Sequence, residues 1–115
     1  MSPNKRPIGV LVVACLYIAV GAIGFVHHFP WPMVFHWEDL WIELTELLAL
    51  IAGVFLLKGD NWARWLAIAW IAFHVAISWP VVRQLVVHAA LLAAIAWLLL
   101  RADAQKFFAA NRNAG

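Results

Sequence analysis

Four apolar stretches dominate the chain, and short polar segments separate them. They cover residues 8–26, 40–57, 62–79 and 82–100. A helix needs about 20 apolar residues to cross a hydrocarbon core about 30 Å thick, so each stretch has nearly the required length. None alternates between apolar and polar residues in the manner of a β-barrel strand. In lipid, the backbone N–H and C=O groups must therefore form their hydrogen bonds within the segment, as they do in a helix. The pattern therefore predicts four transmembrane helices.

Proline residues separate several of these predicted helices. Pro30 and Pro32 interrupt the connection after the first stretch, and Pro80 ends the third. Because the connections are short, neighbouring helices should be antiparallel in one all-α, integral membrane four-helix bundle that comprises residues 1–115. The polar tail after Arg101 predicts a short interfacial helix at the C-terminus.

The N-terminal apolar stretch has a second interpretation. A basic start followed by an apolar run is also the pattern of a secretory signal peptide. However, residues 8–26 form a longer run than a usual signal sequence, and no cleavage site of small residues follows them. We therefore expect this stretch to stay in the protein as its first transmembrane helix.

Composition supports a lipid environment and excludes several other classes. Hydrophobic residues make up 66% of the chain and charged residues 12%, and the mean hydropathy is +0.87, which is too apolar for a soluble domain of this size. Tryptophan, typical of membrane interfaces, occurs eight times. The single cysteine, Cys15, excludes an internal disulfide or CxxC motif. The apolar composition predicts a lipid bilayer as partner. A net charge of +2 without a basic stripe predicts that the protein does not bind nucleic acid.

The basic residues predict the orientation in the membrane. Four crossings place both termini on one side, and seven of the eight Lys and Arg residues then lie on that side. The positive-inside rule makes that side cytoplasmic, in a multi-pass protein of the bacterial inner (plasma) membrane. Arg83 alone falls on the outer side, while the inner set is Lys5, Arg6, Lys58, Arg64, Arg101, Lys106 and Arg112.

This orientation gathers ionisable side chains in the outer half of the protein. At 1.5 Å per residue, Glu46, His74 and His88 each lie roughly 7 to 9 Å from the outer end of their own helix. The three side chains therefore lie at nearly one depth. The complete outer set comprises all five histidines and four acids: His27, His28, His36, His74, His88, Glu38, Asp39, Glu43 and Glu46.

Helical spacing places these groups on stripes that should face the bundle interior, because charged side chains are costly in lipid. We therefore predict a pocket lined by Glu43, Glu46, His74 and His88. A stripe on the first helix, at Ala14, Tyr17, Gly21, Gly24 and His28, has small residues that let a neighbouring backbone approach closely. It also places His28 and Tyr17 at the periphery of the pocket.

Several chemistries fit a carboxylate–imidazole pocket. Glu46, His74 and His88 are candidate ligands for Zn²⁺, Cu²⁺ or Fe²⁺, although their spacing is no recognised metal motif. A proton relay or a quinone-headgroup site needs less exact geometry. A haem would need His74 and His88 on opposite sides of the macrocycle.

A structural interpretation stays open beside the functional ones. Glu43 and Glu46 would lie in the headgroup region if their helix began one turn later. His74 and His88 would then act in hydrogen bonds between helices, each contributing about 0.6 kcal/mol on average.

The middle of the chain resembles a known family. The run Glu46-Leu47-Leu48-Ala49-Leu50-Ile51-Ala52-Gly53-Val54-Phe55-Leu56-Leu57, followed by Asn61-Trp62-Ala63-Arg64-Trp65-Leu66-Ala67, is similar to small DoxX-like membrane proteins over about residues 43–100. The resemblance implies a four-helix inner-membrane bundle. It also implies a role near quinone- or thiol-linked oxidoreductases, of which some family members are accessory subunits. Without a cysteine pair, a thiol-redox role is not expected here.

The sequence thus predicts a binding or accessory protein of the inner membrane. Its outer Glu/His pocket would take a proton, a metal ion or a small polar headgroup, and it would act with a partner, in a homodimer or a larger membrane complex. Catalysis by this chain alone is not expected. The alternatives are an oxidoreductase component that holds a metal, haem or quinone in the pocket, and an assembly factor without a ligand.

Overall fold

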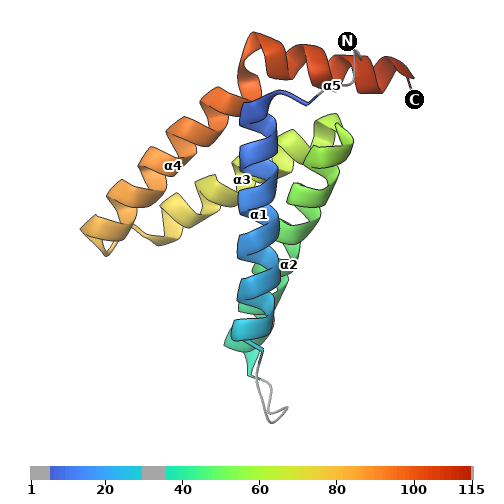
Figure 1. Ribbon diagram of the computed structural model, residues 1–115. Helices are drawn as coiled ribbons and strands as arrows, with labels where there is room; N and C mark the ends of the chain where they lie inside the picture. The colour runs from blue at the N-terminus through green and yellow to red at the C-terminus, as the bar shows by residue number, and fades with distance from the viewer. Residues whose placement is uncertain (1–5, 30–35, 115) are drawn as a thin grey trace.

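The computed structural model describes residues 6–29 and 36–114, with side chains described as far as residue 110. Lys5 and the proline-containing connection at residues 30–35 lie outside the described part. Within it the protein is all-helical, as expected, and three helices (α1, α2 and α4) are long and apolar enough to cross a membrane. The helices are α1 Ile8–His27, α2 Trp37–Lys58, α3 Asn61–Ile77, α4 Val82–Leu100 and α5 Ala102–Ala114 (Figure 1).

Two helix ends differ from the sequence prediction by more than one residue. Helix α2 begins at Trp37 instead of residue 40, because His36 and Asp39 form a capping box in which the His36 N–H donates to Asp39 Oδ2 at 3.2 Å. Helix α3 ends at Ile77 instead of residue 79. The His74 carbonyl accepts both the backbone N–H of Ser78 at 3.1 Å and its hydroxyl at 2.6 Å. With 17 residues, α3 is shorter than the three helices named above.

The turn between α2 and α3 falls where its glycine predicts it. Gly59 has φ 83°, in the left-handed region that a residue with a side chain rarely adopts. Its N–H donates to the Leu56 carbonyl at 3.0 Å, which satisfies one of the last carbonyls of α2.

Helices α1 and α2 pack side by side through small residues (Figure 1). A Cβ on Gly21 of α1 would lie 2.7 Å from the Glu46 carbonyl oxygen of α2. A Cβ on Gly53 of α2 would lie 2.8 Å from the Ala14 carbonyl oxygen of α1. No larger residue fits either position without a backbone shift, so the predicted close approach along the glycine stripe is confirmed.

Close packing of the first four helices is limited to one end of the molecule. Figure 1 shows the α1–α2 and α3–α4 hairpins meeting beneath α5 and diverging away from it. Apolar side chains beyond the junction are exposed, with Trp37 and Trp79 each 75% accessible and Val82 72%. The core lies at the junction and includes Val10, Val13, Leu56, Ala63, Leu99, Ala104, Phe107 and Phe108.

Helix α5 forms part of this core and lies across the ends of the other helices (Figure 1). Phe107 and Phe108 are 3% and 1% exposed. The guanidinium carbon of Arg64 lies 5.1 Å from the Phe108 ring centroid, which is within cation–π range. The polar tail is therefore anchored to α3 through Phe108.

Candidate functional site

Glu46 and His28 pair across the α1–α2 interface. Glu46 Oε1 lies 3.8 Å from His28 Nδ1. The Glu46 carboxyl lies against Gly24, where a Cβ would stand 2.6 Å from Glu46 Cδ, so the missing side chain makes room for it. His28, predicted at the periphery, thus lies within ion-pair distance of Glu46.

Neither oxygen of the Glu46 carboxyl has a hydrogen-bond donor among the residues that the structure describes. Oε2 is buried without a partner, and the 3.8 Å to His28 exceeds hydrogen-bond range for Oε1. His28 Nδ1 instead lies 3.0 Å from the Gly24 carbonyl, so it is this nitrogen that carries the proton. Glu46 therefore retains unused acceptor capacity.

His74 is held by its Nδ1 atom. Nδ1 lies 2.8 Å from the Trp70 carbonyl, and because a carbonyl only accepts, Nδ1 must carry the hydrogen. The ring also stacks on Trp70, with centroids 3.9 Å apart. In the neutral imidazole the lone pair is therefore on Nε2, which has no hydrogen-bond partner among the described residues.

The tautomer of His88 follows in the same way from its hydrogen bond with Ser78. The single hydroxyl proton of Ser78 goes to the His74 carbonyl at 2.6 Å. Ser78 Oγ lies 2.6 Å from His88 Nδ1, so the hydroxyl must accept there and Nδ1 must donate. The two imidazole centroids are 5.9 Å apart. His88 Nε2 is thereby also left as an acceptor.

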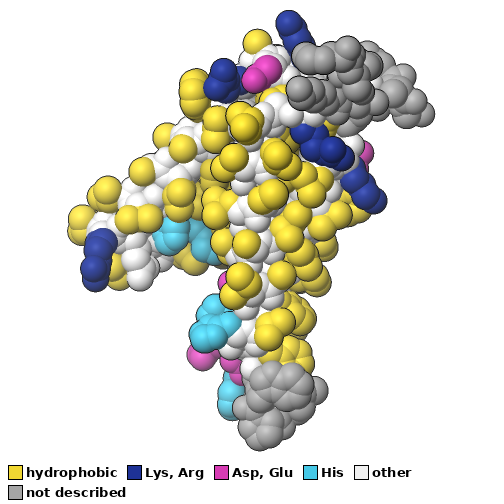
Figure 2. Space-filling view, viewed as in Figure 1, with side chains coloured by type: hydrophobic (Ala, Val, Ile, Leu, Met, Phe, Trp, Pro, Cys, Tyr) yellow, Lys and Arg dark blue, Asp and Glu magenta, His cyan; other side chains and the backbone are white. Residues whose placement is uncertain are grey.

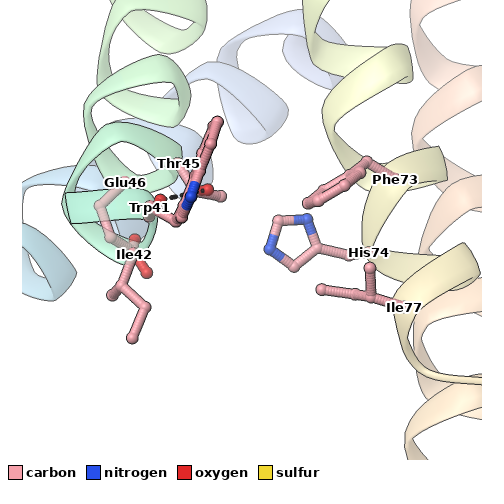
Figure 3. A pocket seen from close by; sticks show the side chains of 7 residues that line it. All are labelled: Trp41, Ile42, Thr45, Glu46, Phe73, His74 and Ile77. Atoms are coloured by element: carbon pink, nitrogen blue, oxygen red, sulfur yellow. Dashed lines mark hydrogen bonds between the residues drawn. The ribbon is translucent and has the colours of Figure 1, made fainter. Parts of the chain in front are cut away.

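Glu46 and His74 lie on opposite walls of one cavity of about 230 Å³ between α2 and α3. Figure 3 shows the His74 ring extending from α3 toward the α2 wall that carries Trp41 and Glu46. We call this space the Glu46–His74 cavity. Its remaining lining is mostly apolar or aromatic: Trp41, Ile42, Thr45, Phe73 and Ile77.

His88 lines a different cavity, of about 220 Å³, between α1, α3 and α4. Tyr17 contributes to it, and its hydroxyl donates to the Ala67 carbonyl at 2.6 Å. We call this space the His88 cavity. It is also lined by Leu16, Val20, Trp70, Ile71, Leu91 and Ile95.

Glu43 lines neither of these two cavities. It is 7% exposed, and both carboxylate oxygens are buried without a hydrogen-bond partner in the described part of the chain. The structure therefore does not gather Glu43, Glu46, His74 and His88 around a single space. It places Glu46 opposite His74, links His74 to His88 through Ser78, and leaves Glu43 apart.

The candidate metal ligands are likewise not gathered. Within residues 6–29 and 36–114, no three His, Cys, Asp or Glu side chains are close enough to hold a metal ion. Catalytic zinc sites use three protein ligands and structural zinc sites use four. Glu46, His74 and His88 do not form such a set in this conformation.

Two further residues, not foreseen from sequence, shape the site. Trp70 donates from Nε1 to the Thr45 carbonyl at 2.8 Å, which joins α3 to α2 beside the cavity. Trp41 stands on the α2 wall between Glu46 and His74 in the view of Figure 3. Sequence spacing could have pointed to Trp70, because it precedes His74 by one helical turn and therefore lies on the same face of α3.

Comparisons of the chain with protein-family models, characterised proteins and solved structures gave no match. The resemblance to DoxX-like proteins stays a prediction. The geometry of the two cavities is therefore the basis for the proposed function.

Proposed function

We propose that this chain is a membrane-embedded binding protein whose Glu46–His74 cavity takes the polar headgroup of a small amphiphile. One observation carries the proposal. His74 Nε2 and the Glu46 carboxylate are acceptors without a hydrogen-bond donor among the described residues, and their side chains line opposite walls of one cavity. A headgroup with two hydrogen-bond donors, such as a diol or a hydroquinone, would satisfy His74 Nε2 and the Oε1 atom of Glu46, whose Oε2 atom is buried against α1.

The hydrogen bonds favour binding over proton conduction. A relay through imidazole takes a proton at one ring nitrogen and releases it from the other. The second nitrogen of His74 bonds a backbone carbonyl, and that of His88 leads through Ser78 to the His74 carbonyl. A carbonyl does not pass a proton on, so both routes end there.

We also propose how the protein lies in the membrane. Helices α1, α2 and α4 cross the bilayer, and α3, about 26 Å long at 1.5 Å per residue, completes a four-helix bundle with them. Both termini are cytoplasmic, and α5 lies on the cytoplasmic surface of a bacterial inner membrane. Lys and Arg side chains lie mostly at the α5 end of the molecule in Figure 2, which supports this orientation.

In this setting the Glu46–His74 cavity lies in the outer half of the membrane. Histidine side chains occupy the angle between the two hairpins in Figure 2, where the hairpins diverge. An amphiphile can therefore reach the cavity from the lipid phase. The exposed apolar faces of the diverging hairpins also suit a partner, in a homodimer or a larger membrane complex.

A second candidate is an oxidoreductase component that holds a quinone. A quinol presents two hydroxyl donors on a flat ring, which matches acceptors on opposite walls of an aromatic-lined cavity. The resemblance to DoxX-like proteins implies the same class of partner. A metal or haem would need further ligands supplied by rearrangement or by a partner, and elemental analysis with an absorption spectrum of the purified protein tests for them.

Binding of decylhydroquinone and of decylbenzoquinone to the full chain in lipid nanodiscs tests the proposal. These probes share a ring and a chain, but only the hydroquinone donates hydrogen bonds. We expect the hydroquinone to bind about 5- to 30-fold more tightly, from one to two hydrogen bonds of about 1 kcal/mol each. Equal binding of the two probes would contradict a donor-selective site.

Glu46→Gln and His74→Phe should each reduce this preference, because each changes one acceptor. His27→Phe is the matched control, since His27 lines neither cavity. If all three variants retain the wild-type preference, the Glu46–His74 cavity is not the site. A ligand-free assembly factor would bind neither probe.

A further inference from the structure

We propose that the His88 cavity is a second ligand site, which takes the hydroxyl end of a single-chain, hydroxyl-headed lipid. The site is separate from the Glu46–His74 cavity, because the two share no lining residue. The proposal rests on its own residues and does not require that the first cavity bind a ligand.

The hydrogen-bond donors that line the His88 cavity are already engaged. The Tyr17 hydroxyl donates to the Ala67 carbonyl at 2.6 Å, and Trp70 Nε1 donates to the Thr45 carbonyl at 2.8 Å. His88 Nδ1 donates to Ser78 Oγ at 2.6 Å. The other lining residues are hydrocarbon: Leu16, Val20, Ile71, Leu91 and Ile95.

A ligand in the His88 cavity can still find a hydrogen-bond acceptor on the protein. Nε2 of neutral His88 carries a lone pair and has no partner among the described residues, because the Ser78 hydroxyl has already fixed the proton on Nδ1. A ligand held at this nitrogen must therefore bring a hydrogen-bond donor. A ketone, an ether or an ester offers none, so these groups leave His88 unsatisfied.

The charge of the headgroup further restricts which lipids fit the His88 cavity. No carboxylate is among the described residues that line this cavity, so an alkylammonium would be desolvated there without a counter-ion. A carboxylate headgroup would have to accept a hydrogen bond, and neutral His88 has no free N–H to give. An uncharged hydroxyl is the remaining common lipid headgroup that fits the cavity.

The surroundings fit a hydrocarbon chain attached to that hydroxyl. The cavity of about 220 Å³ lies between α1, α3 and α4. Its side chains Leu16, Val20 and Leu91 are 43%, 39% and 37% exposed, so the apolar lining continues onto the outer faces of α1 and α4. A chain anchored at His88 can therefore extend along these faces in the bilayer.

Three matched ligands test the proposal by native mass spectrometry of the full chain: 1-hexadecanol, hexadecyl methyl ether and hexadecanoate at pH 8. The alcohol and the ether differ in the donor hydrogen, and hexadecanoate supplies a charged acceptor. We expect one bound hexadecanol, with the ether and the carboxylate each bound at least about fivefold more weakly, as for the loss of one hydrogen bond. Equal binding of alcohol and ether, or tighter binding of hexadecanoate, would overturn the proposal.

Variants then locate the site. His88→Phe should remove the preference for the alcohol over the ether, whereas His27→Phe should keep it. Retention of the preference in His88→Phe would overturn the assignment. The comparison of ligands on the wild-type chain stands even if His88→Phe does not fold.

Glu46→Gln separates this proposal from the function proposed above. It should weaken decylhydroquinone binding and leave the hexadecanol preference intact. If instead Glu46→Gln abolishes the hexadecanol preference and His88→Phe does not, the alcohol occupies the Glu46–His74 cavity, and the second site is wrong.

Discussion

The imidazole of His88 on α4 is held by the hydroxyl of Ser78, which lies just beyond the end of α3, with 2.6 Å between Nδ1 and Oγ. The same hydroxyl donates to the last turn of α3 at the His74 carbonyl. One buried serine, 3% exposed, thereby ties the two helices of the second hairpin together and sets the tautomer of a cavity-lining histidine.

Ser78→Ala should release His88 from this constraint. Without the hydroxyl, His88 no longer favours the proton on Nδ1, and ¹⁵N spectra of histidine-labelled protein should change from one tautomer to a mixture. We also expect a loss of about 1 kcal/mol in stability from the broken bonds, seen as a lower thermal midpoint in detergent. An unchanged Nδ1–H tautomer in the variant would show that Ser78 does not fix it.

Trp70→Phe should loosen the contact between α2 and α3. It removes the N–H that donates to the Thr45 carbonyl at 2.8 Å, while keeping an aromatic ring beside His74. We expect about 1 kcal/mol of destabilisation and weaker binding in both cavities, because Trp70 lines one and positions His74 in the other. Trp65→Phe, at a position 51% exposed, is the control and should behave as wild type.

Gly21→Ala tests the close approach of α1 and α2. The added methyl group would lie 2.7 Å from the Glu46 carbonyl oxygen, and backbone cannot move aside as a side chain does. We expect about 1–3 kcal/mol of destabilisation from overpacking, measured by thermal unfolding in detergent.

Gly9→Ala is the matched control for Gly21→Ala. A Cβ at Gly9 would meet only side-chain atoms of Leu98, the nearest at 2.9 Å, and a flexible leucine can rotate away. A similar loss of stability in both variants would mean that the tight backbone contact at Gly21 contributes nothing special.

Single-cysteine labelling tests the proposed orientation. In a Cys15→Ala background, Arg83→Cys should react with a membrane-impermeant maleimide in intact cells. Ala102→Cys, at the start of α5, should react only after the membrane is permeabilised. The opposite pattern would place the termini outside and move both cavities to the inner half of the bilayer.

Much of the secondary structure followed from the sequence, because helix ends depend on local signals. Gly59 and Pro80 mark turns by their backbone preferences, and α4 occupies the predicted residues. Gly21 correctly indicated the close approach of a neighbouring helix. These features depend on each residue's own shape and need no knowledge of its neighbours.

The divergence of the two hairpins was not predictable in this way. In lipid, no hydrophobic force draws apolar faces together, so an apolar face does not reveal whether it meets another helix or an acyl chain. The position of a residue along its helix could be predicted from the sequence, but the direction of its side chain around the helix axis could not. Glu46 turns toward α1 because Gly24 leaves space there, and that contact exists only once α1 and α2 are packed.

The sequence also did not reveal the hydrogen bonds that leave the Nε2 atoms of His74 and His88 as acceptors. The donors of Tyr17 and Trp70 go to backbone carbonyls of Ala67 and Thr45, and the ring of His74 uses the Trp70 carbonyl. Every residue has a carbonyl, so composition gives no hint of which one is used. The sequence therefore indicated His74 and His88 as candidate site residues without placing them in separate cavities.

The central claim is that His74 Nε2 accepts a hydrogen bond from a bound headgroup. Its most direct test is ¹⁵N spectroscopy of histidine-labelled protein in nanodiscs, titrated with decylhydroquinone. We predict that the Nε2 resonance of His74, assigned with His74→Phe, shifts with saturation while the Nδ1–H resonance stays in place, and that decylbenzoquinone causes no such shift. An unchanged His74 Nε2, or the same shift with both probes, would contradict the account.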